Sequence, residues 1–125
     1  MKNRILIVED DEWIGAMMVD VLSNLDYEVT FIDGLSSAKK LTRYDYAAVI
    51  SDFRLLDGDA CDVIEFLRSK KPDIAAIVTS GDGKQAATDF EDRRISGVVF
   101  VSKPFRPHQL LDALNTCLLT KSRGS

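Results

Sequence analysis

The chain has 125 residues, 46% of them hydrophobic and 29% charged, which is typical of one globular domain with a substantial core. Its formal net charge of -4 gives no polybasic surface for nucleic acid or for an anionic membrane. No apolar run has the length of a membrane span or of a signal-peptide core, so the sequence predicts a cytoplasmic protein. The two cysteines, Cys61 and Cys117, lack metal-ligand spacing and are expected to be free thiols in a reducing compartment.

Short apolar runs alternate with segments of helical periodicity along the whole chain. Residues 5–8 form the first expected strand, and a run of acidic residues leads into an amphipathic helix over about 12–25, with Asp11 as its N-cap. The other strands are expected over 27–32, 46–51, 74–78 and 98–101. The other helices are expected around 35–41, around 63–67 with an end before Pro72, and over about 84–94 and 107–120.

Five strands alternating with five helices predict a parallel sheet that right-handed crossovers cover with helices on both faces. We expect the flavodoxin-like (βα)5 fold, with the strands in the order 2-1-3-4-5. The sequence predicts one domain over 1–120 and a flexible polar tail over 121–125, whose final Gly-Ser is a candidate cloning remnant. In such a sheet the carboxyl ends of all strands lie along one edge, where ligands bind.

Polar side chains follow four of the five expected strands at that edge. Glu9 and Asp10 follow the first strand, Asp52 the third, Thr79 the fourth and Lys103 the fifth. These four strands are neighbours in the expected order. The side chains are therefore predicted to converge, although an isolated Asp after a strand is more often an ordinary loop residue.

The chemistry of this cluster favours phosphoryl transfer. Two carboxylates about 4 Å apart repel by roughly 4 kcal/mol at an effective dielectric constant near 20, so three of them call for a cation or shifted pKa values. Mg²⁺ prefers carboxylate oxygens, waters and a phosphate. Lys103 offers a charge for a phosphate or for Asp52, and Thr79 offers a hydroxyl. Together these groups predict a site where Asp52 forms an acyl phosphate.

The motifs resemble the receiver domain of two-component response regulators. The matching segments are ILIVEDD over 5–11, VISDFRLLDGD over 49–59, IVTSG over 77–81 and VSKPF over 101–105. The resemblance covers about residues 4–119. It implies a phosphoprotein switch of signal transduction that takes its phosphoryl group from a sensor histidine kinase or a histidine phosphotransfer protein. The switch would then act on an output domain or a downstream protein, and it is not a turnover enzyme.

The resemblance also implies a role for each matching residue. Glu9 and Asp10 look like the acidic pair of a Mg²⁺ (or Mn²⁺) site, with Asp10 as the direct ligand. Asp52 looks like the phosphoacceptor and a further ligand, and the backbone carbonyl of Arg54 would complete the protein ligands. No nucleotide-binding glycine motif is present, which argues against a bound nucleotide cofactor.

Three further matches concern signalling. Thr79 looks like the switch hydroxyl that moves toward the phosphoryl group, and Lys103 would pair with that group. Pro104 would follow a cis peptide bond. Phe100 stands where the family has a rotating aromatic residue, although an ordinary core role is equally compatible with its sequence context. The surface expected to change is formed by the helix over 84–94, the strand over 98–101 and the helix over 107–120. The resemblance also allows a phosphorylation-dependent homodimer.

Two departures from the family pattern lie in the segment after Asp52. Leu56 stands where many members have proline, which would restrict φ, and Ala60 stands where many have glycine. Neither change removes a chemical group. Trp13 is expected to pack or to cover the surface beside the acidic site, and His108, the only histidine, is expected to be exposed.

Two alternative functions come from other classes. A phosphate-independent interaction module would usually lack the Asp, the acidic pair or the Lys, and this chain keeps all of them. A phosphatase of the haloacid-dehalogenase type needs a second Asp two residues after its nucleophile, and Arg54 stands there instead.

Overall fold

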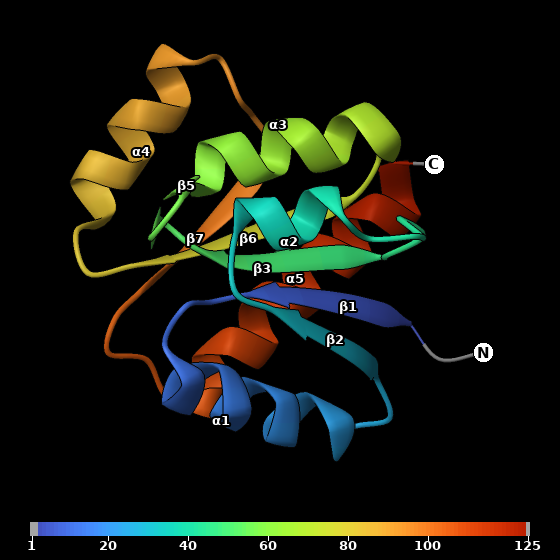
Figure 1. The fold of residues 1–125 in the computed structure, drawn as a ribbon. Coiled ribbons are helices and arrows are strands. Elements are labelled where there is room, and N and C mark those ends of the chain that lie inside the picture. The colour runs from blue at the N-terminus through green and yellow to red at the C-terminus, as the bar shows by residue number, and fades with distance from the viewer. Residues whose placement is uncertain (1–2, 125) are drawn as a thin grey trace.

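The computed structural model describes residues 3–124, with side chains through 119 (Figure 1). The five strands of the main sheet are β1 Arg4–Val8, β2 Glu28–Ile32, β3 Ala48–Asp52, β6 Ala75–Ser80 and β7 Val98–Ser102. The five helices are α1 Glu12–Ser23, α2 Leu35–Lys39, α3 Ala60–Lys70, α4 Gly83–Asp92 and α5 Pro107–Gly124. Two short strands, β4 Arg54–Leu55 and β5 Gly58–Asp59, pair with each other after β3.

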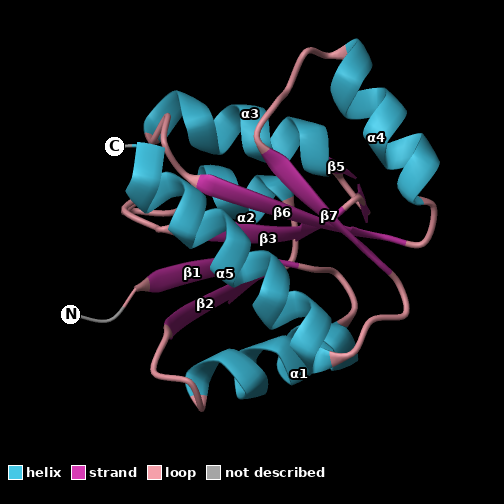
Figure 2. Cartoon of the chain, turned by 180° about the vertical axis from the view of Figure 1, so that it is seen from behind, coloured by secondary structure: helices cyan, strands magenta, loops and turns pink. Residues whose placement is uncertain are grey.

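The main sheet is wholly parallel and has the order β2-β1-β3-β6-β7. Counted among these five strands, that order is 2-1-3-4-5, so the predicted flavodoxin-like topology is confirmed. Helices α1 and α5 cover one face of the sheet, as Figure 2 shows from behind, and α2, α3 and α4 lie on the other. The order places the ends of β1, β3, β6 and β7 side by side.

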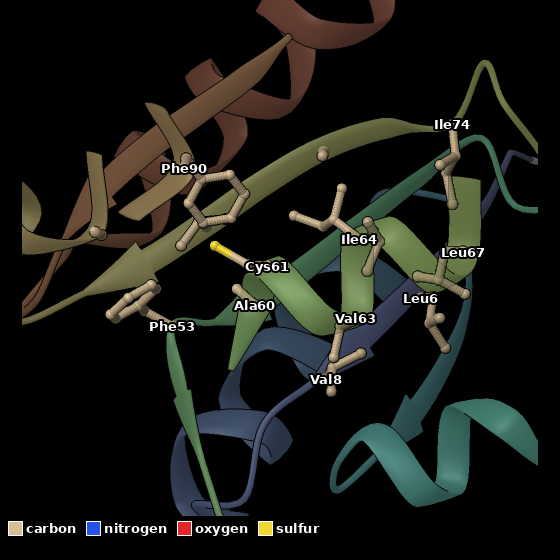
Figure 3. Close-up of a cluster of buried hydrophobic side chains, with 14 of the residues drawn as sticks. Leu6, Val8, Phe53, Ala60, Cys61, Val63, Ile64, Leu67, Ile74 and Phe90 are labelled. Carbon is tan, nitrogen blue, oxygen red and sulfur yellow. The ribbon is translucent and has the colours of Figure 1, made fainter. Parts of the chain in front are cut away.

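The central strands are buried because both of their faces are covered. Successive side chains of a strand point to opposite faces, so Leu6 and Val8 of β1 pack toward α3 while Ile5 and Ile7 pack toward α1 and α5. All four are fully buried, and burying such a side chain contributes roughly 1.5–3 kcal/mol. Figure 3 shows the α3 side of this core, with Leu6 and Val8 beside residues of α3.

The element ends follow local hydrogen bonding. Asp11 caps α1 as predicted, and its carboxylate accepts from the N–H groups of Trp13 and Ile14 at 2.9 and 3.1 Å. That helix ends at Ser23, slightly before the predicted residue 25. Helix α5 extends to Gly124, and the flexibility expected for 121–125 stays a prediction. Ser125 lies outside the described residues, and the domain limit at 120 stays a prediction.

The β4–β5 ribbon is the one element that sequence periodicity did not predict. Each of its strands has two residues, too few to show an alternating pattern. Cys61 and Cys117 are both free and buried, as expected. Within the described chain, no helix combines the length and apolarity needed to cross a membrane.

Candidate functional site

The predicted polar residues meet at the carboxyl edge of the main sheet. Glu9 and Asp10 directly follow β1, and Asp52 is the last residue of β3. Asp52 pairs in register with Thr79 of β6. One carboxylate oxygen from each of Glu9, Asp10 and Asp52 lies within 4.8 Å of the others. The three acidic side chains therefore lie close together in the folded protein.

Lys103 neutralises part of this cluster. Its ammonium lies 3.1 Å from Asp52 Oδ1 and 3.2 Å from Glu9 Oε2. The backbone N–H of Lys103 donates to the Ser80 carbonyl at 2.8 Å, and the peptide bond to Pro104 is cis, as the resemblance implies. Burial alone would lower the pKa of Lys103, but the hydrogen bonds and charges of Asp52 and Glu9 raise it. The side chain is thus a stable cation at neutral pH.

Glu9 is the most buried acid of the cluster, with 1% of its surface exposed. Burial, together with the charge of Asp52, raises the pKa of Glu9 to about 7, against the opposing effects of the Asp11 N–H and Lys103. The Asp11 N–H donates to Glu9 Oε1 at 3.1 Å. A buried carboxylate beside two others is a strong site for additional positive charge.

Thr79 is fully buried, and its side-chain oxygen has no hydrogen-bond partner within the described chain. Its carbonyl accepts from the Phe53 N–H at 2.8 Å, so the backbone is fixed while the hydroxyl is not. An unpaired buried hydroxyl costs about 1–3 kcal/mol, which a ligand oxygen at the site would recover.

A pocket of about 290 Å³ opens beside Asp52, lined by Asp52, Phe53, Arg54, Ser80, Gly81, Asp82 and Lys103. The Asp52 side chain is 13% exposed, so it faces this opening without being free in solvent. A second hollow contains Glu9 and Asp10, but not Asp52, among its lining residues. A small anionic group in the first pocket would therefore contact Asp52 and Lys103 together.

Phe100 is not an ordinary core residue. The residue is 38% exposed, and its ring meets Phe90 of α4 edge-on, with the ring centroids 5.4 Å apart. It lines a groove of about 440 Å³ between α4 and β7. Phe90 in turn lies 6.4 Å from the ring of Phe53, the residue after Asp52. This aromatic row links the end of β3 to the α4–β7 surface.

The two departures from the family pattern have different consequences. Leu56 is 93% exposed in the turn between β4 and β5. Ala60 is the buried first residue of α3, and its N–H donates to the Phe53 carbonyl at 2.9 Å. Because Ala60 is not among the non-glycine residues with positive φ, alanine is compatible with this position. Trp13 is 88% exposed and covers little, and His108 is exposed as expected.

Sequence reasoning missed Arg93, at the C-terminal end of α4. Its guanidinium lies 3.0 Å from Asp62 Oδ1 and 3.4 Å from Asp59 Oδ1, and it also pairs with Glu65. Burial lowers the pKa of Arg93, but the hydrogen bonds that its guanidinium donates to the Glu65 and Asp62 carboxylates outweigh burial and raise the pKa. The three acids recur every third residue from the N-cap of α3 into its second turn, a spacing that places them on one side of the helix and calls for a counter-charge.

The fold and this edge define a class of protein: a doubly wound α/β domain with a carboxylate cluster and an adjacent lysine built for phosphate chemistry. The family model of the response regulator receiver domain matches residues 5–115, and the chain belongs to this family. Receiver domains are signalling switches that bind Mg²⁺ at an acidic pocket and interact with sensor kinases and output domains.

Individual relatives agree with this assignment. The chemotaxis protein CheY of Thermotoga maritima is 28% identical, and the match covers 92% of this chain and 97% of that protein. The transcriptional regulatory protein CssR of Bacillus subtilis is also 28% identical over 89% of this chain, which spans 49% of CssR. The non-phosphorylated HemR receiver domain of Leptospira biflexa matches with a TM-score of 0.80 at 29% identity over 94% of both chains. The chain is thus a phosphoacceptor receiver, and a phosphate-independent module is not favoured.

Proposed function

We propose that Asp52 is the phosphoacceptor and that its donor is the phosphohistidine of a sensor histidine kinase or a histidine phosphotransfer protein. The observation that carries this proposal is the contact of Asp52 Oδ1 with the Lys103 ammonium at 3.1 Å, at the wall of the 290 Å³ pocket. Among the clustered acids, Asp52 is the one that lines this pocket together with the lysine. Asp52 is therefore reachable from the pocket, and the ammonium beside it can pair with the negative charge of an incoming phosphoryl group.

In the proposed step an oxygen of Asp52 attacks the phosphorus atom of the donor in line with the breaking P–N bond. The electron pair of that bond stays on the imidazole nitrogen, which takes up a proton, and an aspartyl phosphate forms. Lys103 then pairs with the phosphoryl oxygens, since its ammonium already contacts Asp52. Water later hydrolyses the acyl phosphate, which returns Asp52 to its carboxylate.

Glu9, Asp10, Asp52 and the backbone carbonyl of Arg54 would hold Mg²⁺ or Mn²⁺ beside this step. The fit rests on three carboxylates whose oxygens lie within 4.8 Å of one another, and on the preference of these ions for oxygen ligands. When bound, the ion offsets negative charge on the phosphoryl oxygens. Asp10 is the proposed direct ligand of the acidic pair.

Thr79 and Phe100 are the proposed switch residues. The Thr79 hydroxyl, buried and without a partner in the described chain, would donate to a phosphoryl oxygen. Its movement would leave space into which Phe100 turns, and the surface of α4, β7 and α5 would change for an output domain, a partner or a second copy. We place the protein in the cytoplasm, with no direct nucleic-acid contact and no turnover activity of its own.

The first experiment is intact-protein mass spectrometry after incubation with acetyl phosphate, with and without Mg²⁺. We expect a Mg²⁺-dependent gain of one phosphoryl group that is absent in Asp52→Asn, which keeps the shape of the side chain. A phosphoryl group that still appears at the same place in Asp52→Asn would refute the assignment. No gain under any condition would instead favour the phosphate-independent interaction module.

A further inference from the structure

The short helix α2 takes its N-terminal cap from a distant loop. Its N-cap position is Gly34, which has no side chain to accept hydrogen bonds. The carboxylate of Asp57 supplies them: Oδ1 accepts from the Leu35 N–H at 2.9 Å, and Oδ2 accepts from the Ser36 N–H at 2.8 Å. Asp57 is 22 residues away from Leu35 in sequence, so this cap is a tertiary contact.

Close approach is what requires glycine at position 34. A Cβ atom built there would lie 2.5 Å from Asp57 Oδ1. The backbone conformation is not the reason, because the extended φ of Gly34 is one that any residue can adopt. The N–H groups of Ser36 and Leu35 lower the pKa of Asp57, so the cap is charged at neutral pH. The contact thus depends on the glycine at position 34, on the N–H groups of Leu35 and Ser36, and on the charged carboxylate of Asp57.

Asp57 lies in the turn of the β4–β5 ribbon, which follows Asp52 along the chain. Arg54 pairs with Asp59 across the ribbon, and Leu55 pairs with Gly58. Leu56, the other residue of the turn, is 93% exposed and restrains nothing through its side chain. The carboxylate of Asp57 therefore anchors the tip of the ribbon, while Leu55, packed against the core, and the ion pair of Asp59 with Arg93 hold its base.

We infer that Asp57 is a positioning residue for the metal site, because its two hydrogen bonds to α2 hold the ribbon that carries the Arg54 carbonyl. This inference rests on the proposed function, in which that carbonyl is a ligand beside Asp10 and Asp52. A ligand that is already in place binds an ion more tightly than one that visits the position part of the time. Leu56 does not stiffen the turn as a proline would, which leaves this task to Asp57.

The test compares Mg²⁺ binding by calorimetric titration of the wild type, Asp57→Ala, Asp57→Asn and Asp33→Ala. Asp33 is the matched control, because it lines the same hollow as Asp57 while its carboxylate accepts from the Ser37 hydroxyl, within the α2 region, at 2.6 Å. Its removal deletes one negative charge near the site without releasing the ribbon. Hydrogen exchange of the Leu35 and Ser36 amides reports the cap in each variant.

We expect Asp57→Ala to weaken Mg²⁺ binding by roughly five- to tenfold, Asp33→Ala by less than about twofold, and Asp57→Asn to fall between them. The asparagine keeps one side-chain acceptor and so restores part of the cap. Exchange at Leu35 and Ser36 should accelerate in the same order. Equal affinities of Asp57→Ala and Asp33→Ala would overturn the inference alone. A wild type that binds no Mg²⁺ would overturn the proposed function, and the inference with it.

Discussion

Helices α3 and α4 lie on the same face of the sheet but are attached to it very differently. α3 buries Ala60, Cys61, Val63, Ile64 and Leu67 and begins with a reciprocal capping box between Asp59 and Asp62. α4 buries only Ala86 and Phe90 and depends on the ion pairs of Arg93 with α3 and with the ribbon. A helix with many buried side chains moves with the core, whereas one with a single large anchor can shift at small cost. The proposed switch surface therefore includes α4, the helix with the single large anchor.

The largest expected effect is that of Phe90→Ala. Phe90 is 2% exposed and is the one large buried side chain of α4, so its removal should lower the free energy of unfolding by about 4 kcal/mol. Chemical denaturation measures this loss. Hydrogen exchange should show α4 opening separately from the sheet, and a variant whose α4 amides stay as protected as those of α3 would contradict the comparison.

Ile64→Ala tests the other helix. Ile64 is fully buried in α3, and its truncation should lower the free energy of unfolding by about 3 kcal/mol. Because four other buried residues still anchor α3, its amides should open only with global unfolding. Independent opening of α3 in this variant would show that its attachment is no firmer than that of α4.

Arg93→Gln addresses the ion pairs alone. The Arg93 side chain is 34% exposed and its three carboxylate partners are exposed to a similar or greater degree, so solvent screens the network. We expect a loss of only about 0.5–1 kcal/mol, which should shrink as salt concentration rises. A loss that is as large at high salt as at low salt would indicate a packing role for the side chain instead.

Cys61 offers a natural thiol probe of the α3–α4 contact. Burial, followed by the charge of Asp59, raises the pKa of its thiol to about 12, so the folded protein holds the unreactive protonated form at pH 8. In a Cys117→Ser background, labelling by a thiol reagent should be slow and should accelerate at least tenfold in Phe90→Ala. Equal rates in the two proteins would mean that Cys61 is exposed by an opening that does not involve α4.

Several features of the fold followed from the sequence because they arise from local patterns. Short apolar runs predicted β1, β3, β6 and β7. The remaining long strand, β2, mixes apolar residues with Glu28 and Thr30 and is partly exposed. The topology rule for parallel sheets then brought Glu9, Asp52 and Lys103 together without any knowledge of distances. The predicted cap at Asp11 was confirmed because a cap acts within three residues.

Other features were set by contacts between distant segments. The β4–β5 ribbon is too short to carry a periodic signal, and the cap that Asp57 gives to α2 joins residues 22 apart. The half-exposed position of Phe100 depends on where α4 lies, and its sequence context left its role open.

The sequence by itself therefore determined the order of the elements, the edge of the sheet at which the acids gather and the class of chemistry that those acids favour. The tertiary structure decided which oxygen faces the lysine, that the Thr79 hydroxyl has no partner in the described chain, and how loosely α4 is held. The physical reason is range: propensity and periodicity act over a few residues, whereas burial, ion pairing and hydrogen-bond satisfaction depend on segments that meet only when the chain is folded.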